Sequence, residues 1–285
     1  MRIRRSHQAD PVPNREVPTG ARPATTPTAA DATRRVVHHI AGSVGPLLDT
    51  AIAIPGSEWT VGETAAHLTY TTIGMAMMAK GLAVPHGNGT RQGFAEANTL
   101  SLQGFAERDA TVLAAHLERA AESALRQLAV APADLICPTP FGELNPATLV
   151  CYLLTHNLMH GCAIAIALDA PTPFQAAYLE LLRPFYVHVL ARVVDDDTTR
   201  GLTACVEFRA GDDFSIGISF DAGKLTVSRF APRPPDALIE SDPYTFFLMA
   251  TKMITVTEAI AQGAARVSGT KPELGSTVMN LFQVP

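Results

Sequence analysis

The sequence predicts two parts of different fold class, a helical bundle followed by a smaller α+β domain with an antiparallel sheet. Between residues 31 and 194, apolar side chains recur at every third or fourth position, which is the spacing of a helix with one buried face. After residue 200 they alternate with polar side chains, as in strands with one buried face. With 285 residues, 47% of them hydrophobic, the chain is long enough to bury a core in both parts.

Residues 1–30 have a different composition from the rest of the chain. They combine arginines and prolines with few large hydrophobic residues, which is typical of disordered segments. No apolar core of a signal peptide follows the arginines. We therefore expect a disordered N-terminal arm, or a segment read from an upstream start codon, and a first domain that begins at residue 31.

Two helices are expected at the start of this domain. Asp31 is the expected N-cap of the first, which should end near Ile54-Pro55-Gly56. The second begins after Ser57 or Thr60, because Thr60-Val61-Gly62-Glu63 has the spacing of a capping box. It should run to about Gly81 and carry His67. Its methionines are expected in the core or in a pocket wall, at positions Met75, Met77 and Met78.

Three further helices complete the prediction for the helical part. A glycine-rich connection, Pro85 to Gly93, and a polar stretch should precede a helix over 109–129 with a single apolar stripe. Asn145-Pro146 begins the next helix, with asparagine as cap and proline at the first position, and it should end near residue 168. A fifth helix over 174–194 should lead into an acidic linker, Asp195-Asp196-Asp197. Residues 31–172 then form the bundle, and 173–199 connect it to the second domain.

The second domain, residues 200–285, should begin with three strands. Alternating residues place them at 202–208, 214–220 and 225–227, with hairpin turns at 211–213 and 221–224. A helix should follow over 241–249, then a returning strand over 264–268 and a closing helix over 273–282. This order indicates an α+β domain built on an antiparallel meander.

Composition excludes several classes of protein. The net charge of −5 argues against nucleic-acid binding, which usually needs a basic face. The most apolar segment, 149–168, contains polar residues near its middle, so we expect no membrane span. The four cysteines show neither CxxC spacing nor a disulfide framework, which favours a reducing, cytoplasmic setting. Cys151 and Cys162 are expected to be small buried residues of a core helix.

Three histidines are candidate metal ligands. His156 and His160 lie four residues apart in a predicted helix, so their imidazoles share one face and can converge on one ion. A third histidine from the neighbouring helix, His67, would complete three nitrogen ligands and leave coordination positions open, as in catalytic zinc sites. Glu63, one turn before His67, is expected to be a capping-box acid and not a fourth ligand. The remaining histidines considered are expected to be hydrogen-bonded core residues: His38, His39, His86, His116 and His188.

The run from Trp59 to Glu63 leading to His67, with His156 and His160 on a later helix, resembles the DinB-like metal-binding bundle of mycothiol-dependent maleylpyruvate isomerases. The C-terminal segments resemble the sterol-carrier-protein-2-like domain that follows this bundle in the family, through residues 259–263, 267–269 and 281–282. The resemblance covers about residues 31 to 285. It implies a DinB-like four-helix bundle followed by a sterol-carrier-protein-2-like α+β domain.

The resemblance also implies roles for individual residues. His67 matches the family's histidine ligand on the second helix, and His156 and His160 match a pair in which the first ligand is glutamate or histidine. Three neutral imidazoles would leave a zinc site with charge +2, so a bound water or thiol would be more acidic than with glutamate. The family's active-site arginine corresponds best to Lys252, which offers a point charge instead of a bidentate fork. Arg229 and Arg266 are the alternative candidates for binding a substrate carboxylate.

The leading hypothesis is a zinc-dependent enzyme, with zinc or another divalent metal and mycothiol as co-substrate. The metal would hold this low-molecular-weight thiol as thiolate for isomerisation or S-transfer on a small electrophilic substrate, similar to a maleylpyruvate isomerase. One alternative is a non-catalytic carrier that binds an apolar ligand in its C-terminal domain. Another is a thiol-independent metal-dependent hydrolase. The expected partners are small molecules, with no nucleic acid and no membrane span.

Overall fold

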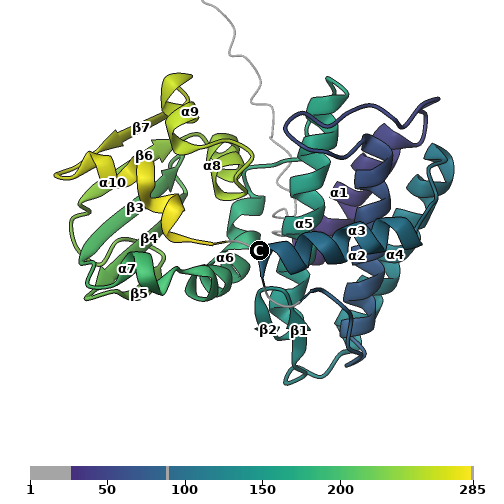
Figure 1. Ribbon diagram of the computed structural model, residues 1–285, viewed down its shortest axis with the longest axis horizontal. Coiled ribbons are helices and arrows are strands. Elements are labelled where there is room, and N and C mark those ends of the chain that lie inside the picture. Colours follow the sequence, from purple (N-terminus) through teal and green to yellow (C-terminus); the bar gives the residue numbers. More distant parts are fainter. Residues whose placement is uncertain (1–26, 88–89, 284–285) are drawn as a thin grey trace, which may run out of the picture.

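The computed structural model describes residues 27–87 and 90–283, with a helical part and a sheet-containing part that lie on opposite sides of helix α6 (Figure 1). Most of the predicted disordered arm, residues 1–26, lies outside the described residues. The first helix, α1 (Ala29–Val44), begins two residues before the predicted boundary at 31. The fold is therefore of mixed helix and sheet, as predicted, with most of its helices before the five-stranded sheet.

The bounds of α1 differ from the prediction at both ends. Its N-cap is Thr28, not Asp31; Asp31 stands at the third helical position and closes a capping box with Thr28. The helix ends at Val44, about ten residues earlier than predicted, because Pro46 follows and proline has no N–H to continue the helical hydrogen bonds. Residues 47–55 form a loop instead.

Helix α2 (Val61–Met78) begins as predicted, with Thr60 as N-cap and Glu63 completing the capping box. Helix α3 (Arg91–Gly104) was missed. Thr90 caps it where a glycine-rich connection and a polar stretch were expected. Of its residues, only Gly93 and Leu102 are buried as it packs on α2, so it shows no apolar stripe that periodicity could detect.

Four of the described helices pack against one another and form the centre of the helical part: α1, α2, α4 (Ala110–Val130) and α5 (Pro146–Ala167). Asn145 caps α5, with Pro146 at the first helical position, as predicted. Asp109, the expected first residue of its helix, is the N-cap of α4. A hairpin of two three-residue strands lies between them, β1 (Cys137–Thr139) and β2 (Gly142–Leu144). Strands this short carry no alternation, so the sequence did not predict them.

Helix α5 is long and apolar enough to cross a membrane by length and composition, but 72% of its most apolar window is buried inside the protein. A buried core helix passes the same test, so no membrane span is shown. Helix α6 (Tyr178–Val193) then contacts both α5 and the sheet. The acidic run expected as a linker begins a short helix, α7 (Asp196–Thr199), which Asp195 caps.

The sheet has five strands in the order β5-β4-β3-β6-β7. Strands β3 (Ala204–Ala210), β4 (Phe214–Asp221) and β5 (Lys224–Ser228) form the predicted antiparallel meander. The prediction of a wholly antiparallel sheet was wrong, because β6 (Ala237–Ser241) pairs parallel to β3. After β5 the chain crosses to the other side of β3 through a proline-rich segment, Pro232 to Pro235, and so enters β6 in the same direction as β3. Strand β7 (Ala265–Ser268) pairs antiparallel to β6, where a returning strand was predicted.

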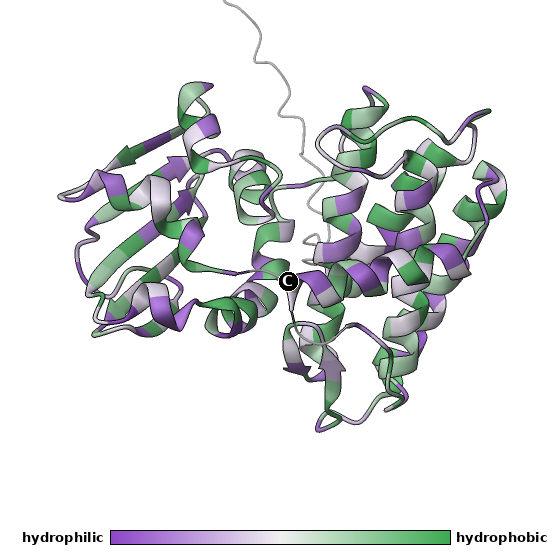
Figure 2. Cartoon of the chain, in the orientation of Figure 1, coloured by the Kyte–Doolittle hydropathy of each residue, from purple (hydrophilic) through white to green (hydrophobic). Residues whose placement is uncertain are grey.

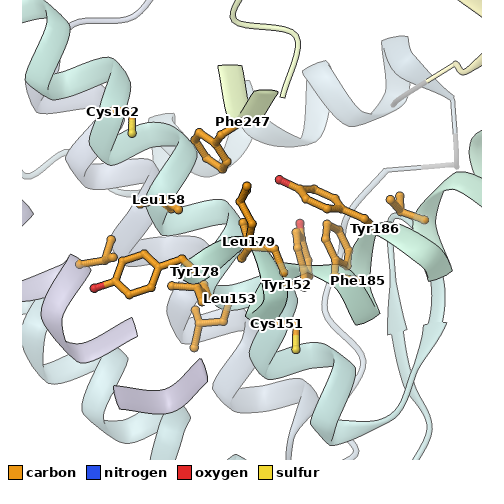
Figure 3. Packing of buried hydrophobic residues seen from close by; sticks show 14 of the residues in the cluster. Cys151, Tyr152, Leu153, Leu158, Cys162, Tyr178, Leu179, Phe185, Tyr186 and Phe247 are labelled. Atoms are coloured by element: carbon orange, nitrogen blue, oxygen red, sulfur yellow. The ribbon is translucent and has the colours of Figure 1, made fainter. Parts of the chain in front are cut away.

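Short helices complete the sheet-containing part: α8 (Pro243–Ala250), α9 (Val256–Ala261), α10 (Pro272–Thr277) and a final 3-10 helix over Val278–Leu281. The sequence predicted α8, missed α9 and merged the last two into one helix. Hydrophobic and hydrophilic residues are interspersed along the elements of both parts (Figure 2). A single hydrophobic core nevertheless runs through both, and Figure 3 shows Phe247 of α8 beside Leu158 and Cys162 of α5.

Candidate functional site

Three imidazoles converge between α2 and α5. His67 lies on α2, and His156 and His160 lie one turn apart on α5. One ring nitrogen from each lies within 4.8 Å of the others, and the Nε2 atoms of His67 and His156 are 3.1 Å apart. Ligand atoms about 2.0–2.1 Å from a tetrahedral zinc ion are about 3.3 Å from each other. The three histidines therefore have the spacing of a shared metal site.

Burial keeps these imidazoles neutral. His67 and His156 are buried and His160 is partly buried. Desolvation lowers the pKa of His67 and His156 well below the usual value, and the neighbouring His160 lowers both further. Desolvation lowers the pKa of His160 to about 4. The neutral form is the one that binds metal, so no proton has to be removed near neutral pH.

The rings are positioned by packing more than by hydrogen bonds. The Nδ1 atoms of His67 and His156 are buried and have no hydrogen-bond partner among the described residues, although metal-binding histidines usually donate from this second nitrogen. Trp59 lies against His67, with ring centroids 4.7 Å apart, and stacks on His160 at 6.1 Å. Tyr152 meets the edge of His156 at 5.9 Å. Three nitrogen donors with room for further ligands suit zinc or a similar divalent ion.

The local sequence explains why the three side chains meet. The capping box at Thr60 fixes the start of α2, and so fixes the turn at which His67 points toward α5. Gly161, directly after His160, lets α1 approach closely, since a Cβ there would lie 2.9 Å from the side chain of Ile40. Close packing of α1 against α5 thus depends on the glycine beside His160.

Glu63 is committed to the capping box and is not a ligand. Its Oε2 atom accepts hydrogen bonds from the backbone N–H of Thr60, at 2.8 Å, and from the Thr60 hydroxyl, at 3.0 Å. Within residues 27–87 and 90–283, the cluster that could hold an ion contains only histidines. The site therefore offers no carboxylate ligand and no evident general base.

A cavity of about 480 Å³ opens from the three histidines. Helices α3 and α6, the turn between β1 and β2, and the sheet-containing part supply its other walls, so residues far apart in the sequence share it. Most of the lining is aromatic or aliphatic, including Phe141, Tyr152, Phe185, Tyr186, Phe208 and Phe246. Burial raises the pKa of both tyrosines, which therefore stay protonated. The sequence interpretation missed this aromatic wall; the one available signal was Tyr152, four residues before His156 on the same helix face.

The three candidates for carboxylate binding lie in different places. Lys252 lines the cavity, and its ammonium donates a hydrogen bond of 2.9 Å to the backbone oxygen of Phe282. Arg229 is exposed and pairs with Glu180 at 3.2 Å. Arg266 is exposed on β7 and pairs with Glu240 at 2.7 Å. Neither arginine is part of the cavity lining, so the structure brings only Lys252 to the histidines.

Several other predictions concern residues around the site. Met75 and Met78 are buried as expected, whereas Met77 is exposed. All four cysteines are buried free thiols, and burial raises the pKa of Cys151 and Cys162 to about 11, so neither is a ready nucleophile.

The prediction of a buried core position was wrong for one of the other histidines. His38 is exposed and pairs with Glu118 at 3.0 Å. His39, the next residue of α1, is half-buried and hydrogen-bonds the backbone oxygen of Pro171.

Comparisons with known proteins find distant structural likenesses only. No protein-family model matches the chain, and no curated protein matches it. A mycothiol-dependent maleylpyruvate isomerase aligns at 13% identity and a TM-score of 0.47, over 78% of this chain and 87% of that one; a variant of an enzyme of the same name gives 0.48. A stereoselective inverting sec-alkylsulfatase from Pseudomonas sp. aligns at 18% identity and 0.32, over 48% of this chain. The chain spans about a quarter of that sulfatase, covering 24% of its length. Likenesses of this size do not identify a family.

Proposed function

We propose that this protein is a zinc-dependent enzyme that activates a low-molecular-weight thiol for reaction with a small electrophile. The observation that carries the proposal is the convergence of three neutral imidazoles on one cavity, with no carboxylate among them. A divalent ion bound there would keep a charge of +2 and would strongly lower the pKa of a thiol that binds to it. The histidines hold the ion, and Trp59 and Tyr152 fix the orientation of their rings.

The thiol is proposed to be mycothiol, on the sequence resemblance to mycothiol-dependent maleylpyruvate isomerases. As thiolate it would add to an electron-poor double bond; the C–S bond forms and the π electrons move onto the conjugated carbonyl oxygen. Rotation about the resulting single bond and expulsion of the thiolate give the isomer, whereas protonation of the carbon leaves the S-adduct. In this proposal residues 31–172 form the metal-binding domain and 200–285 face the substrate. The four free cysteines fit a reducing cytoplasmic setting.

Two other functions make different demands on the site. A hydrolase needs a base for its attacking water, and Glu63 is already occupied by the N-terminus of α2. A carrier of apolar ligands is favoured by the apolar lining of the cavity. It gives no role to the three clustered imidazoles, however, two of which have an Nδ1 atom without a partner among the described residues.

Metal binding can be followed through Trp59, the single tryptophan of the chain, which contacts two of the ligands. Cobalt or copper titrated into metal-free protein should quench its fluorescence with one ion per chain. His156→Ala should weaken binding about 100-fold or more, if a zinc affinity of about 10–16 kcal/mol is shared among four ligands. His116→Ala is the matched control, because His116 lies on α4 and contacts Phe105 instead of the cluster.

The thiol is tested separately, with metal-loaded protein and mycothiol. Zinc should lower the pKa of the bound thiol, which the ultraviolet absorbance of the thiolate reports. Binding of less than one ion per chain, or equal affinity in wild type and His156→Ala, would refute the metal site. Metal binding without any thiolate signal would refute thiol activation and favour the hydrolase.

A further inference from the structure

The hydroxyl group of Tyr152 is an unassigned hydrogen-bond donor in the cavity wall. The side chain is 6% exposed, lines the cavity and contacts the ring of His156. Among the described residues, none makes a hydrogen bond to its hydroxyl. Buried polar atoms without a partner do occur in this core, but the Tyr152 oxygen is not one of them. It therefore keeps accessible surface. Such a group is available to a ligand in the cavity.

The neighbouring rings hold Tyr152 in one orientation. Phe185 stacks on it with a centroid distance of 4.8 Å and an interplanar angle of 17°. Phe141 meets it edge-on at 5.2 Å. Figure 3 shows Tyr152 beside Phe185, with its hydroxyl on the side of Tyr186, another residue of the cavity wall. A donor fixed in this way loses little conformational freedom when it binds an acceptor.

Apart from the side-chain amide of Asn98, the rest of the cavity offers few donors to a charged ligand. The Lys252 ammonium already donates to the backbone of Phe282. The hydroxyls of Thr155 and Thr251 donate to backbone oxygens of their own helices, at 2.8 Å in both cases. A buried carboxylate needs several hydrogen bonds, so a dicarboxylate fits this lining poorly. An aromatic or branched aliphatic body fits it well, because such surfaces gain most from burial against rings.

We propose that the substrate is an α,β-unsaturated carbonyl compound with an apolar body, and that Tyr152 donates a hydrogen bond to its carbonyl oxygen. The reactive double bond of the substrate rests on the proposed function. Its apolar body and its hydrogen-bond acceptor rest on the cavity alone. When the thiolate adds, the electron pair of the double bond moves to the carbonyl oxygen. The hydrogen bond from Tyr152 then strengthens and stabilises that oxygen, and it weakens again when the thiolate leaves.

The matched control is Tyr186→Phe. Tyr186 lines the same cavity, but its hydroxyl is sealed in protein and has no partner among the described residues, so it cannot reach a ligand. The probe is 4-phenylbutan-2-one, a saturated ketone that cannot react with thiols, labelled with ¹³C at the carbonyl. Its infrared C=O stretch should lie at lower frequency when bound to wild type or to Tyr186→Phe than when bound to Tyr152→Phe. Equal frequencies in wild type and Tyr152→Phe would overturn the hydrogen bond. This measurement is made on both metal-free and zinc-loaded protein.

The apolar body is tested by ligand binding, followed through Trp59 in the cavity wall. 4-Phenylbutan-2-one should bind about tenfold or more tightly than succinate, since burial of a phenyl ring stabilises the complex. Ala250→Leu adds volume at a cavity-lining position and should weaken ketone binding, whereas Ala191→Leu adds the same atoms at an exposed position of α6. Succinate binding as tightly as the ketone, or equal affinities in the two leucine variants, would overturn the substrate class.

Turnover distinguishes this inference from the proposed function. With mycothiol and zinc, (Z)-4-phenylbut-3-en-2-one should convert to the E isomer, and Tyr152→Phe should lower kcat by about 100-fold with little change in KM. A loss of less than threefold would overturn the catalytic role of Tyr152. If wild type binds the ketone with a shifted carbonyl stretch but shows no thiol-dependent turnover, the inferred binding mode stands and the thiol enzyme is refuted.

Discussion

Acidification of the metal-free protein should destabilise it before any carboxylate titrates. His67, His156 and His160 have lowered pKa values in the folded protein, whereas a histidine in the unfolded chain titrates near 6.5. Below that value the unfolded chain binds more protons than the folded one, so the free energy of unfolding falls as the pH falls. The stability that these groups contribute is fully present above pH 6.5 and is lost below it.

The size of the effect follows from the structure. For His160, with a folded pKa of about 4, linkage predicts a loss of about 2 kcal/mol between pH 7.5 and pH 5. His67 and His156 are more deeply buried. Each can lose at most about the same free energy over this interval, because the loss begins only when the pH falls below the pKa of histidine in the unfolded chain. The cluster as a whole is therefore worth up to about 6 kcal/mol, a large part of the stability of a typical domain.

Urea denaturation at pH 7.5 and pH 5, with metal removed, measures this loss. His156→Gln should reduce the difference between the two pH values by about 2 kcal/mol, because one buried imidazole is gone. His38→Gln, at an exposed position of α1 outside the cluster, is the matched control. His188, whose pKa burial also lowers, contributes equally to all three proteins. A pH difference that is the same in wild type and in His156→Gln would refute the assignment of these imidazoles as buried and neutral.

Three further substitutions and one labelling reaction test the packing of the protein. Tyr186→Phe should raise the free energy of unfolding by about 1–2 kcal/mol, measured with urea, because it removes a buried hydroxyl that has no partner among the described residues. Cys162 should react with iodoacetamide far more slowly at pH 7.5 in folded than in denatured protein, since burial raises its pKa to about 11; equal rates would contradict its burial. Gly217→Ala should destabilise the protein by more than about 2 kcal/mol, because its Cβ would lie 2.5 Å from the backbone after β5. Gly42→Ala on α1, where a Cβ has no neighbour within 4 Å, should instead stabilise it by about 0.5–1 kcal/mol.

The sequence predicted elements well where one face is buried or a cap is present. Asn145-Pro146 and the Thr60 capping box fixed the starts of α5 and α2, because these interactions are local. Helix α3 was missed because it buries little, and β1 and β2 were missed because three residues show no period. The alternation of apolar residues could not predict the parallel pairing of β6 with β3 either, because this pairing depends on the crossover after β5.

The candidate site was predictable only in part, because local interactions can be inferred from the sequence and contacts between distant segments cannot. An i, i+4 pair such as His156 and His160 shares a helix face, so its convergence follows from helix geometry. The meeting with His67 depends on the packing of α2 against α5, which the sequence indicated only through the resemblance. The aromatic wall around Tyr152 and Phe185 joins side chains of two helices and faces the sheet-containing part, so no local pattern could assemble it.

The charge of the site favours a metal-dependent function over a carrier and a thiol over water. Two buried imidazoles whose Nδ1 atoms have no partner among the described residues cost about 1–3 kcal/mol per unsatisfied group, which a protein that only holds an apolar ligand would have no reason to retain. A divalent ion bound to the facing Nε2 atoms would contribute binding energy that offsets this cost, yet it would leave a double positive charge beside aromatic rings. Since Glu63 is held by the backbone of Thr60, the balancing anion must enter with a substrate or co-substrate. A thiolate supplies that anion and needs no base once it is bound, whereas a bound hydroxide still needs a group to take its proton during hydrolysis.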